Sequence, residues 1–200
     1  MKFDPQTHHR RSIRLDGYDY TQAGAYFVTI SAWQRECLFG EVVEGEMRLN
    51  TAGKIANEQW VKLGRRFTGG DFSLYVIMPN HVHGIIVLDG ASRGAGEEFQ
   101  CQDSFNPPLR PYVNPHVVPG SLGAIVRAYK ASVSFRIHAM QGYDETPIWQ
   151  RNYYEHIIRD DADFHRIAEY IQDNPRRWTQ DQLHPGASSN PFNQDHQHSS

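Results

Sequence analysis

Residues 72–88, which read FSLYVIMPNHVHGIIVL, constrain the fold of this chain more than any other stretch. Two runs of aliphatic and aromatic residues flank Pro79-Asn80, and a pair of this kind is a turn signal. The stretch therefore predicts two strands that fold back on each other. Because alternate side chains of a strand point to the same face of a sheet, His81 and His83 share one face and Val82 points to the other.

The paired histidines allow two interpretations. The chain contains 11 histidines, so two can meet by coincidence, and a histidine in an apolar strand is commonly a hydrogen-bonded core residue. Buried polar side chains are costly without partners, however, and here two of them face the same way. A pair of imidazoles on one face is also a ready set of metal ligands. From this pattern alone, a structural role and metal binding both remain open.

Length and composition limit the class of protein. A chain of 200 residues with 39% hydrophobic residues suits one domain with a proper core. No apolar run approaches the ~20 residues of a membrane-spanning helix, and the first residues lack the apolar core of a secretory signal. Cys37 and Cys101 match neither a metal-binding spacing nor a disulfide framework. We expect a cytoplasmic protein with no membrane partner.

Positive charge is clustered, although the net charge is −3. Nucleic-acid recognition depends on local patches, so the total charge does not exclude it. The candidate patches contain Arg10, Arg11 and Arg14 near the N-terminus, Arg127 with Lys130, and Arg176. Each cluster, taken alone, is also compatible with an ordinary solvated surface.

The order of the elements predicts the fold. Strand patterns cover residues 25–33 and 153–158 besides the central pair, and helix patterns cover residues 51–64, 121–140 and 161–174. Residues 38–49 predict a small separate hairpin. Without that hairpin the order is strand, helix, strand, strand, helix, strand, followed by one more helix. This order is typical of an α+β, ferredoxin-like (split βαβ) fold, whose antiparallel sheet leaves one face for the last helix.

Three segments lie outside this pattern. Residues 1–24 are expected to form an arm, residues 89–119 a long loop rich in Gly and Pro, and residues 180–200 a disordered tail. The domain itself would then comprise residues 25–179.

The last predicted helix carries two polar residues that suit a reactive site. Tyr170 and Asn174 are four positions apart, so they lie one turn from each other on the same side of the helix. A tyrosine is a possible nucleophile, and an amide oxygen is a possible ligand of a divalent ion. The plain alternative is that Tyr170 only packs, as most tyrosines in helices do.

Three segments together resemble the single-tyrosine HUH transposases, and among these the REP-associated tyrosine transposases. They are HVH after an apolar strand, WQRNYYEHIIRD at residues 149–160 and AEYIQDNPRRW at residues 168–178. The likeness covers roughly residues 20–178, and the family has the ferredoxin-like fold. The motifs also contain Tyr153 and Tyr154, which are rival nucleophiles, and Glu155 and His156, of which at most one faces the site.

The resemblance implies a function and a set of site residues. His81, His83 and Asn174 would hold a divalent ion, Mg²⁺ or Mn²⁺, and Tyr170 would be the catalytic nucleophile. The substrate would be single-stranded DNA beside a hairpin-forming repeat, cut through a 5′-phosphotyrosine and rejoined by strand transfer. The basic clusters named above would contact the DNA. Both a monomer and a homodimer are compatible with the sequence.

Two other functions remain open. A regulator that binds DNA hairpins without catalysis needs no nucleophile, and the intact Tyr170 and histidine pair disfavour it. A metal-dependent phosphodiesterase would use water in place of the tyrosine. Only the tyrosine route leaves the protein attached to a 5′ end.

Overall fold

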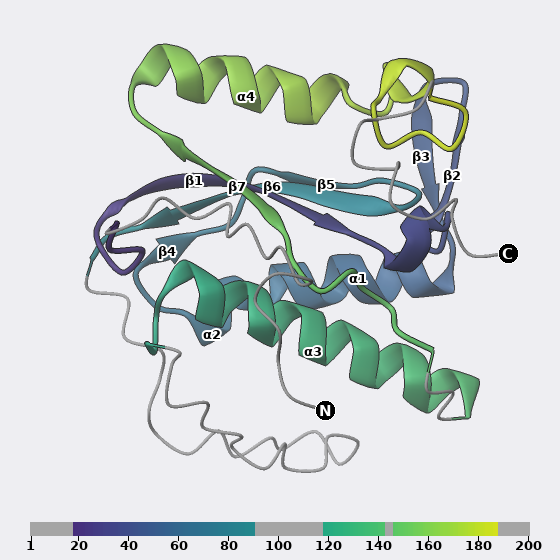
Figure 1. Cartoon of the computed structure of the whole chain (residues 1–200), viewed down its shortest axis with the longest axis horizontal. Coiled ribbons are helices and arrows are strands. Elements are labelled where there is room, and N and C mark those ends of the chain that lie inside the picture. The colour runs from purple at the N-terminus through teal and green to yellow at the C-terminus, as the bar shows by residue number, and fades with distance from the viewer. Residues whose placement is uncertain (1–17, 91–117, 143–145, 188–200) are drawn as a thin grey trace, which may run out of the picture.

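The computed structural model describes residues 18–90, 118–142 and 146–187. Most of the expected arm, most of the expected loop at 89–119, and residues 188–200 lie outside this described part. Figure 1 shows three layers, with a central sheet, helices α1 and α3 on one face, and helix α4 on the other. None of the helices in the described ranges is both long and apolar enough to cross a lipid bilayer.

The central sheet confirms the predicted ferredoxin-like topology. Its strands are β1 (Gly24–Ser31), β4 (Gly70–Asp71), β5 (Tyr75–Ile77), β6 (His81–Leu88) and β7 (Tyr154–Ile158). The order is β4-β6-β1-β7, β5 also pairs with β6, and every pairing is antiparallel. Strands β2 (Gly40–Val43) and β3 (Glu46–Leu49) form the expected separate hairpin.

The helices are α1 (Thr51–Val61), α2 (Leu63–Arg66), α3 (Leu122–Gln141) and α4 (Asp161–Asp173), with short 3₁₀ turns at Trp33–Arg35 and Trp178–Gln180. Side chains cap the N-terminal ends of α1, α3 and α4. The side chains of Asn50, Ser121 and Asp160 each accept a hydrogen bond from a backbone N–H of the first helical turn. These caps satisfy donors that have no partner inside a helix.

The predicted strand at residues 72–78 is shorter in the structure, where β5 covers only Tyr75–Ile77. Between β4 and β5, Phe72 turns its ring into the core, and its carbonyl accepts a hydrogen bond from the indole of Trp60 at 2.9 Å. The Phe72 carbonyl is therefore bonded to a side chain of α1 and not to a neighbouring strand. The first strand likewise ends at Ser31 instead of Trp33, because Gln34 and Arg35 adopt positive φ angles and turn the chain.

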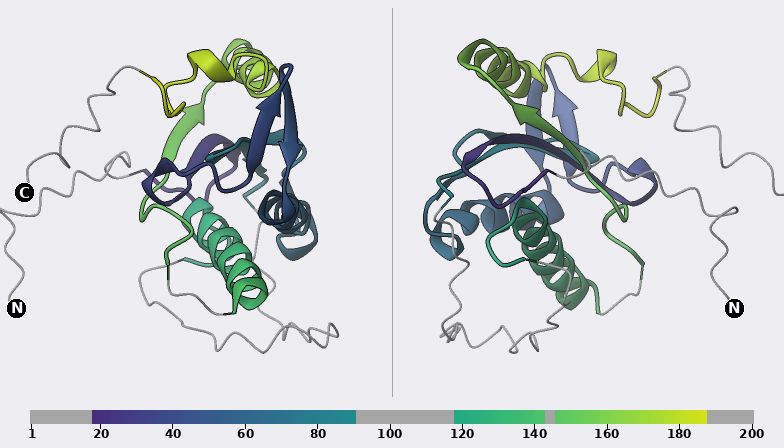
Figure 2. Two further views of the ribbon diagram at one scale, coloured as in Figure 1. Left: turned by 90° about the vertical axis from the view of Figure 1, so that its right-hand side faces the viewer. Right: turned by 60° about the vertical axis from the view of Figure 1, so that its left-hand side comes forward.

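Strand β6 separates two apolar clusters. Val82, Ile86 and Leu88 pack with α1 and α3 in the main core. Ile85 belongs to a smaller cluster that includes Ile167 of α4. The last helix therefore covers the face that the sequence left free, as Figure 2 shows from two further directions.

Gly84 of β6 is a position where no side chain fits. A Cβ atom there would lie 2.3 Å from Cζ2 and 2.5 Å from Cη2 of the Trp60 ring. We expect Gly84→Ala to lower the free energy of unfolding by about 1–3 kcal/mol, because the buried ring must move. Gly64→Ala is the control, since its Cβ would be 3.8 Å from the nearest atom and alanine favours a helix. Thermal denaturation of the two variants checks this, and equal melting temperatures would contradict it.

Candidate functional site

The two histidines lie side by side beneath helix α4. Both are buried, and their ring centroids are 4.3 Å apart. They share one face of β6 while Val82 packs in the main core, as the strand period predicted. Because β6 is paired with β1 and β5 on its two sides, the backbone that carries the histidines is held in place.

Both imidazoles are neutral. Burial, and then the charge of Arg35, lower the pKa of His81 to about 3. Burial also holds the pKa of His83 well below its ordinary value, and Nδ1 of this ring lies 2.8 Å from Oγ1 of Thr29. The neutral imidazole is the form that binds a metal ion.

Helix α4 brings Tyr170 to this pair. Its hydroxyl lies 3.2 Å from Nε2 of His83, and the residue remains 38% exposed. The ring packs edge-on against Phe27, with centroids 6.2 Å apart. Burial, and then the negative charge of Asp181, raise the pKa of Tyr170 to about 12. The hydroxyl is therefore protonated in the absence of a cation.

Asn174 lies one helical turn further and is 1% exposed. Its Nδ2 donates to Oδ2 of Asp181 at 3.1 Å. Its Oδ1 is buried and has no hydrogen-bond partner in the described part of the chain. Buried acceptors without a hydrogen-bond donor are rare in proteins, and a bound cation would account for this one.

Asp181 was not among the site residues expected from the sequence. We expected a disordered tail from residue 180, but residues 181–187 are placed beside the site, and Asp181 is buried. Its Oδ2 accepts a hydrogen bond from the Tyr170 hydroxyl at 3.3 Å, and its Oδ1 accepts one from the backbone N–H of Leu183 at 2.6 Å. One acidic residue after a helix carries no pattern that would have singled it out.

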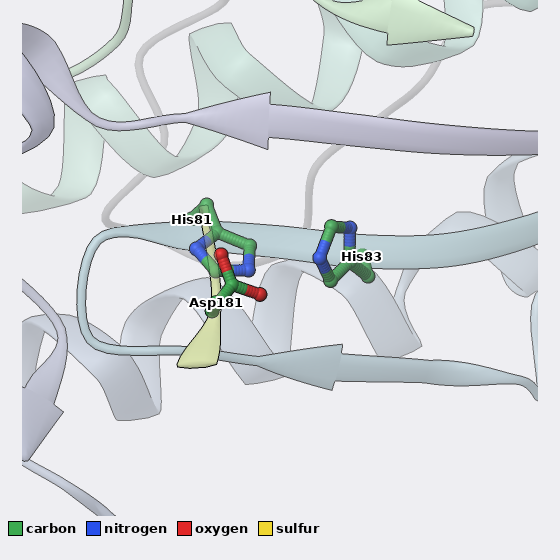
Figure 3. A group of neighbouring side chains, drawn as sticks. All are labelled: His81, His83 and Asp181. Atoms are coloured by element: carbon green, nitrogen blue, oxygen red, sulfur yellow. The ribbon is translucent and has the colours of Figure 1, made fainter. Parts of the chain in front are cut away.

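The residues around the histidines fit a divalent cation. One ligand atom each from His81, His83 and Asp181 lies within 4.8 Å of the others, and Figure 3 shows the three side chains gathered over β6. Nε2 of His81, like Oδ1 of Asn174, is buried without a hydrogen-bond partner among the described residues. Imidazole nitrogens with carboxylate and amide oxygens form a mixed donor set that suits Mn²⁺, and the oxygens suit Mg²⁺.

The other residues of the matched motif point in different directions. Tyr154 lies on the α4 face with its ring against Phe27, whereas Tyr153 packs against the main core. Glu155 is opposite Val28, which belongs to the main core, so its side chain points away from the site. His156 is on the α4 face, but its Nε2 lies 2.7 Å from the carboxylate of Asp163 at the start of α4.

The predicted DNA contacts are spread over the molecule. Arg10, Arg11 and Arg14 lie outside the described residues. Arg176 is exposed just after α4, and its guanidinium lies 3.7 Å from the carboxylate of Asp173. Arg127 is exposed on α3. This helix covers the face of the sheet opposite α4.

Lys130 is used differently from Arg127. Its Nζ donates to the backbone carbonyls of Gln150, Arg151 and Asn152 at 2.5, 3.3 and 3.3 Å, and burial lowers its pKa to about 8. We therefore expect Lys130 to hold the segment that leads into β7, and not a phosphate.

A pair of variants separates these roles. Lys130→Met should lower the free energy of unfolding by about 1–3 kcal/mol, because three backbone carbonyls lose a charged donor. Arg127→Met should leave the stability nearly unchanged and weaken DNA binding in a salt-dependent way. Denaturant titration and binding at two salt concentrations check this. A stable Lys130→Met variant with weakened DNA binding would contradict it.

The chain is similar in sequence to two known proteins of Haemophilus influenzae. No family model matches it. An uncharacterized protein of Haemophilus influenzae is 40% identical over 186 residues, which is 92% of this chain and 97% of that protein. The chain belongs to one family with this Haemophilus protein.

Two further comparisons confirm the resemblance expected from the motifs. A second Haemophilus influenzae protein, described as a candidate REP-associated tyrosine transposase, is 51% identical over 35 residues, 18% of this chain and 20% of that protein. The solved structure of a REP-associated tyrosine transposase bound to a REP hairpin matches with a TM-score of 0.50 and 19% identity, over 83% of this chain and 74% of that chain. The chain thus shares the fold of that transposase.

Proposed function

We propose that this protein cleaves and rejoins single-stranded DNA at hairpin-forming repeats through a tyrosine–DNA intermediate. The observation that carries the proposal is the position of the Tyr170 hydroxyl, 3.2 Å from a buried, neutral histidine of the pair. The solved transposase of the same fold is bound to a REP hairpin, which supports DNA of this kind as the substrate. All the residues of the site come from one chain, so a single copy can assemble it.

His81, His83 and Asp181 would hold a divalent ion, Mg²⁺ or Mn²⁺, with Asn174 as a further oxygen donor. Such an ion acts as a Lewis acid and as a template for the phosphate. The resemblance implies His81, His83 and Asn174 as the ligands. We add Asp181 to this set.

The side chains supply the nucleophile and an acceptor for its proton. Oη of Tyr170 attacks phosphorus, the bond to the 3′ oxygen breaks, and the product is a 5′-phosphotyrosine with a free 3′-hydroxyl. Oδ2 of Asp181, 3.3 Å away, is placed to accept the phenol proton, and the leaving 3′ oxygen takes up a proton. A later attack by a 3′-hydroxyl on the phosphotyrosine rejoins the strands and frees Tyr170.

The proposal is tested with labelled single-stranded oligonucleotides that contain imperfect hairpins, in Mn²⁺ or Mg²⁺. We expect a covalent adduct that survives denaturing electrophoresis and carries the fragment on the 3′ side of the cut. Cleavage with two free DNA ends would favour the water-dependent phosphodiesterase. Hairpin binding without cleavage in either ion would favour the idle regulator.

The ligand role of Asp181 leads to a separate prediction. Asp181→Ala should weaken Mn²⁺ binding by at least about tenfold, because a charged oxygen donor is lost. Asp173→Ala is the control, since this partly exposed carboxylate at the end of α4 pairs only with Arg176 and Arg177 in the described part of the chain. Paramagnetic resonance of free Mn²⁺ measures both affinities. Unchanged affinity with slower cleavage would leave Asp181 only the role of proton acceptor.

A further inference from the structure

Asn80 joins three separate segments of the chain beneath the site. It is fully buried in the turn between β5 and β6. Its Nδ2 donates to the carbonyl of Arg35 at 3.0 Å and to the carbonyl of Leu183 at 2.7 Å. Its Oδ1 lies 2.8 Å from Nδ1 of His81. All the hydrogens of this amide are therefore engaged.

These contacts determine which way the amide points. Carbonyl oxygens only accept hydrogen bonds, so the NH₂ group must face Arg35 and Leu183. A flipped amide would set its oxygen against two other oxygens. Oδ1 of Asn80 consequently faces His81 and can only accept.

The amide orientation in turn determines the tautomer of His81. Since Oδ1 accepts, Nδ1 of the imidazole must carry the hydrogen. A neutral imidazole has only one N–H, so Nε2 keeps its lone pair. That nitrogen is the buried ring atom without a hydrogen-bond partner among the described residues.

The same amide holds the backbone on both sides of the site. Arg35, whose carbonyl it binds, follows Gln34, and both have positive φ angles of 58° and 51°. Such angles are strained for residues other than glycine, so the turn needs support from its surroundings. On the other side, Leu183 is two residues after Asp181 and donates its N–H to that carboxylate.

We propose that Asn80 is a positioning residue, which keeps Nε2 of His81 unprotonated for a cation and ties the Asp181 segment to the histidine strand. The inference rests on the proposed metal site, but its tautomer can be measured without any metal. Outer partners of this kind set the tautomer and orientation of metal-binding histidines in general.

The first test is a long-range ¹H–¹⁵N correlation spectrum of the His81 ring in the metal-free, full-length protein at neutral pH. We expect a protonated Nδ1 and a bare Nε2 in the unchanged protein. A hydrogen on Nε2 would overturn the inference, whether or not the protein cuts DNA. Failure of the proposed function would appear elsewhere, as the absence of a covalent adduct.

Two substitutions separate the two parts of the role. Asn80→Ala should give a mixture of His81 tautomers and weaken Mn²⁺ binding by roughly tenfold to a hundredfold. Asn80→Asp keeps an oxygen for Nδ1 but remakes at most one of the two carbonyl contacts. It should retain the tautomer and speed amide hydrogen exchange at Leu183 and its neighbours. Asn57→Ala is the control. Asn57 lies on α1, and its side-chain oxygen accepts a hydrogen bond from the Tyr75 hydroxyl at 2.9 Å. An unchanged tautomer and Mn²⁺ affinity in Asn80→Ala would overturn the inference.

Discussion

Tyr170→Phe is expected to abolish the covalent adduct and to slow DNA cleavage by at least about a thousandfold, because the nucleophile is removed. Hairpin binding should change little, since only one oxygen atom is removed and the ring can still pack against Phe27. The fold should also tolerate the change, because the side chain is 38% exposed. Cleavage is followed on denaturing gels and binding by fluorescence anisotropy.

Tyr154→Phe is the matched control for this prediction. Tyr154 is 52% exposed, and its ring contacts the same Phe27 from the neighbouring strand. The proposed mechanism does not use its hydroxyl, so adduct formation should continue. Full activity of Tyr170→Phe, with or without loss in Tyr154→Phe, would contradict the assignment of the nucleophile.

His81→Ala is expected to remove cleavage in Mg²⁺ and in Mn²⁺ alike. The variant lacks one buried nitrogen ligand, so the affinity for Mn²⁺ should fall by at least about tenfold as well. His165→Ala is the control, because this histidine is exposed on α4 and its Nδ1 lies 2.6 Å from the backbone carbonyl of Asp161. Retained hairpin binding would show that His81→Ala is folded. Persistent cleavage by this variant would refute His81 as a ligand.

The parts of the site on regular elements could be predicted because their geometry follows from sequence spacing. His81 and His83 share a face because side chains of a strand alternate, and Tyr170 and Asn174 share a side because a helix repeats after about four residues. The order of strands and helices left one face of the sheet free, and α4 covers it.

The remaining features depend on contacts between distant segments. Asp181 lies in an irregular stretch, so no helix or strand periodicity predicts that it lies beside the histidines of β6. Asn80 had the appearance of an ordinary turn residue, and only the positions of two distant carbonyls reveal its role. Lys130 sits on a helix among other basic residues, and the three carbonyls that bind it come from another segment.

The most direct measurement is to find the residue that carries DNA in the covalent adduct. The protein is incubated with a cleavable hairpin oligonucleotide and Mn²⁺, the adduct is digested with protease and nuclease, and the peptides are analysed by mass spectrometry. We predict one nucleotide-bearing peptide, with the 5′ phosphate on the hydroxyl of Tyr170. A phosphate on Tyr153 or Tyr154, or efficient cleavage with no modified peptide, would contradict the proposed active site.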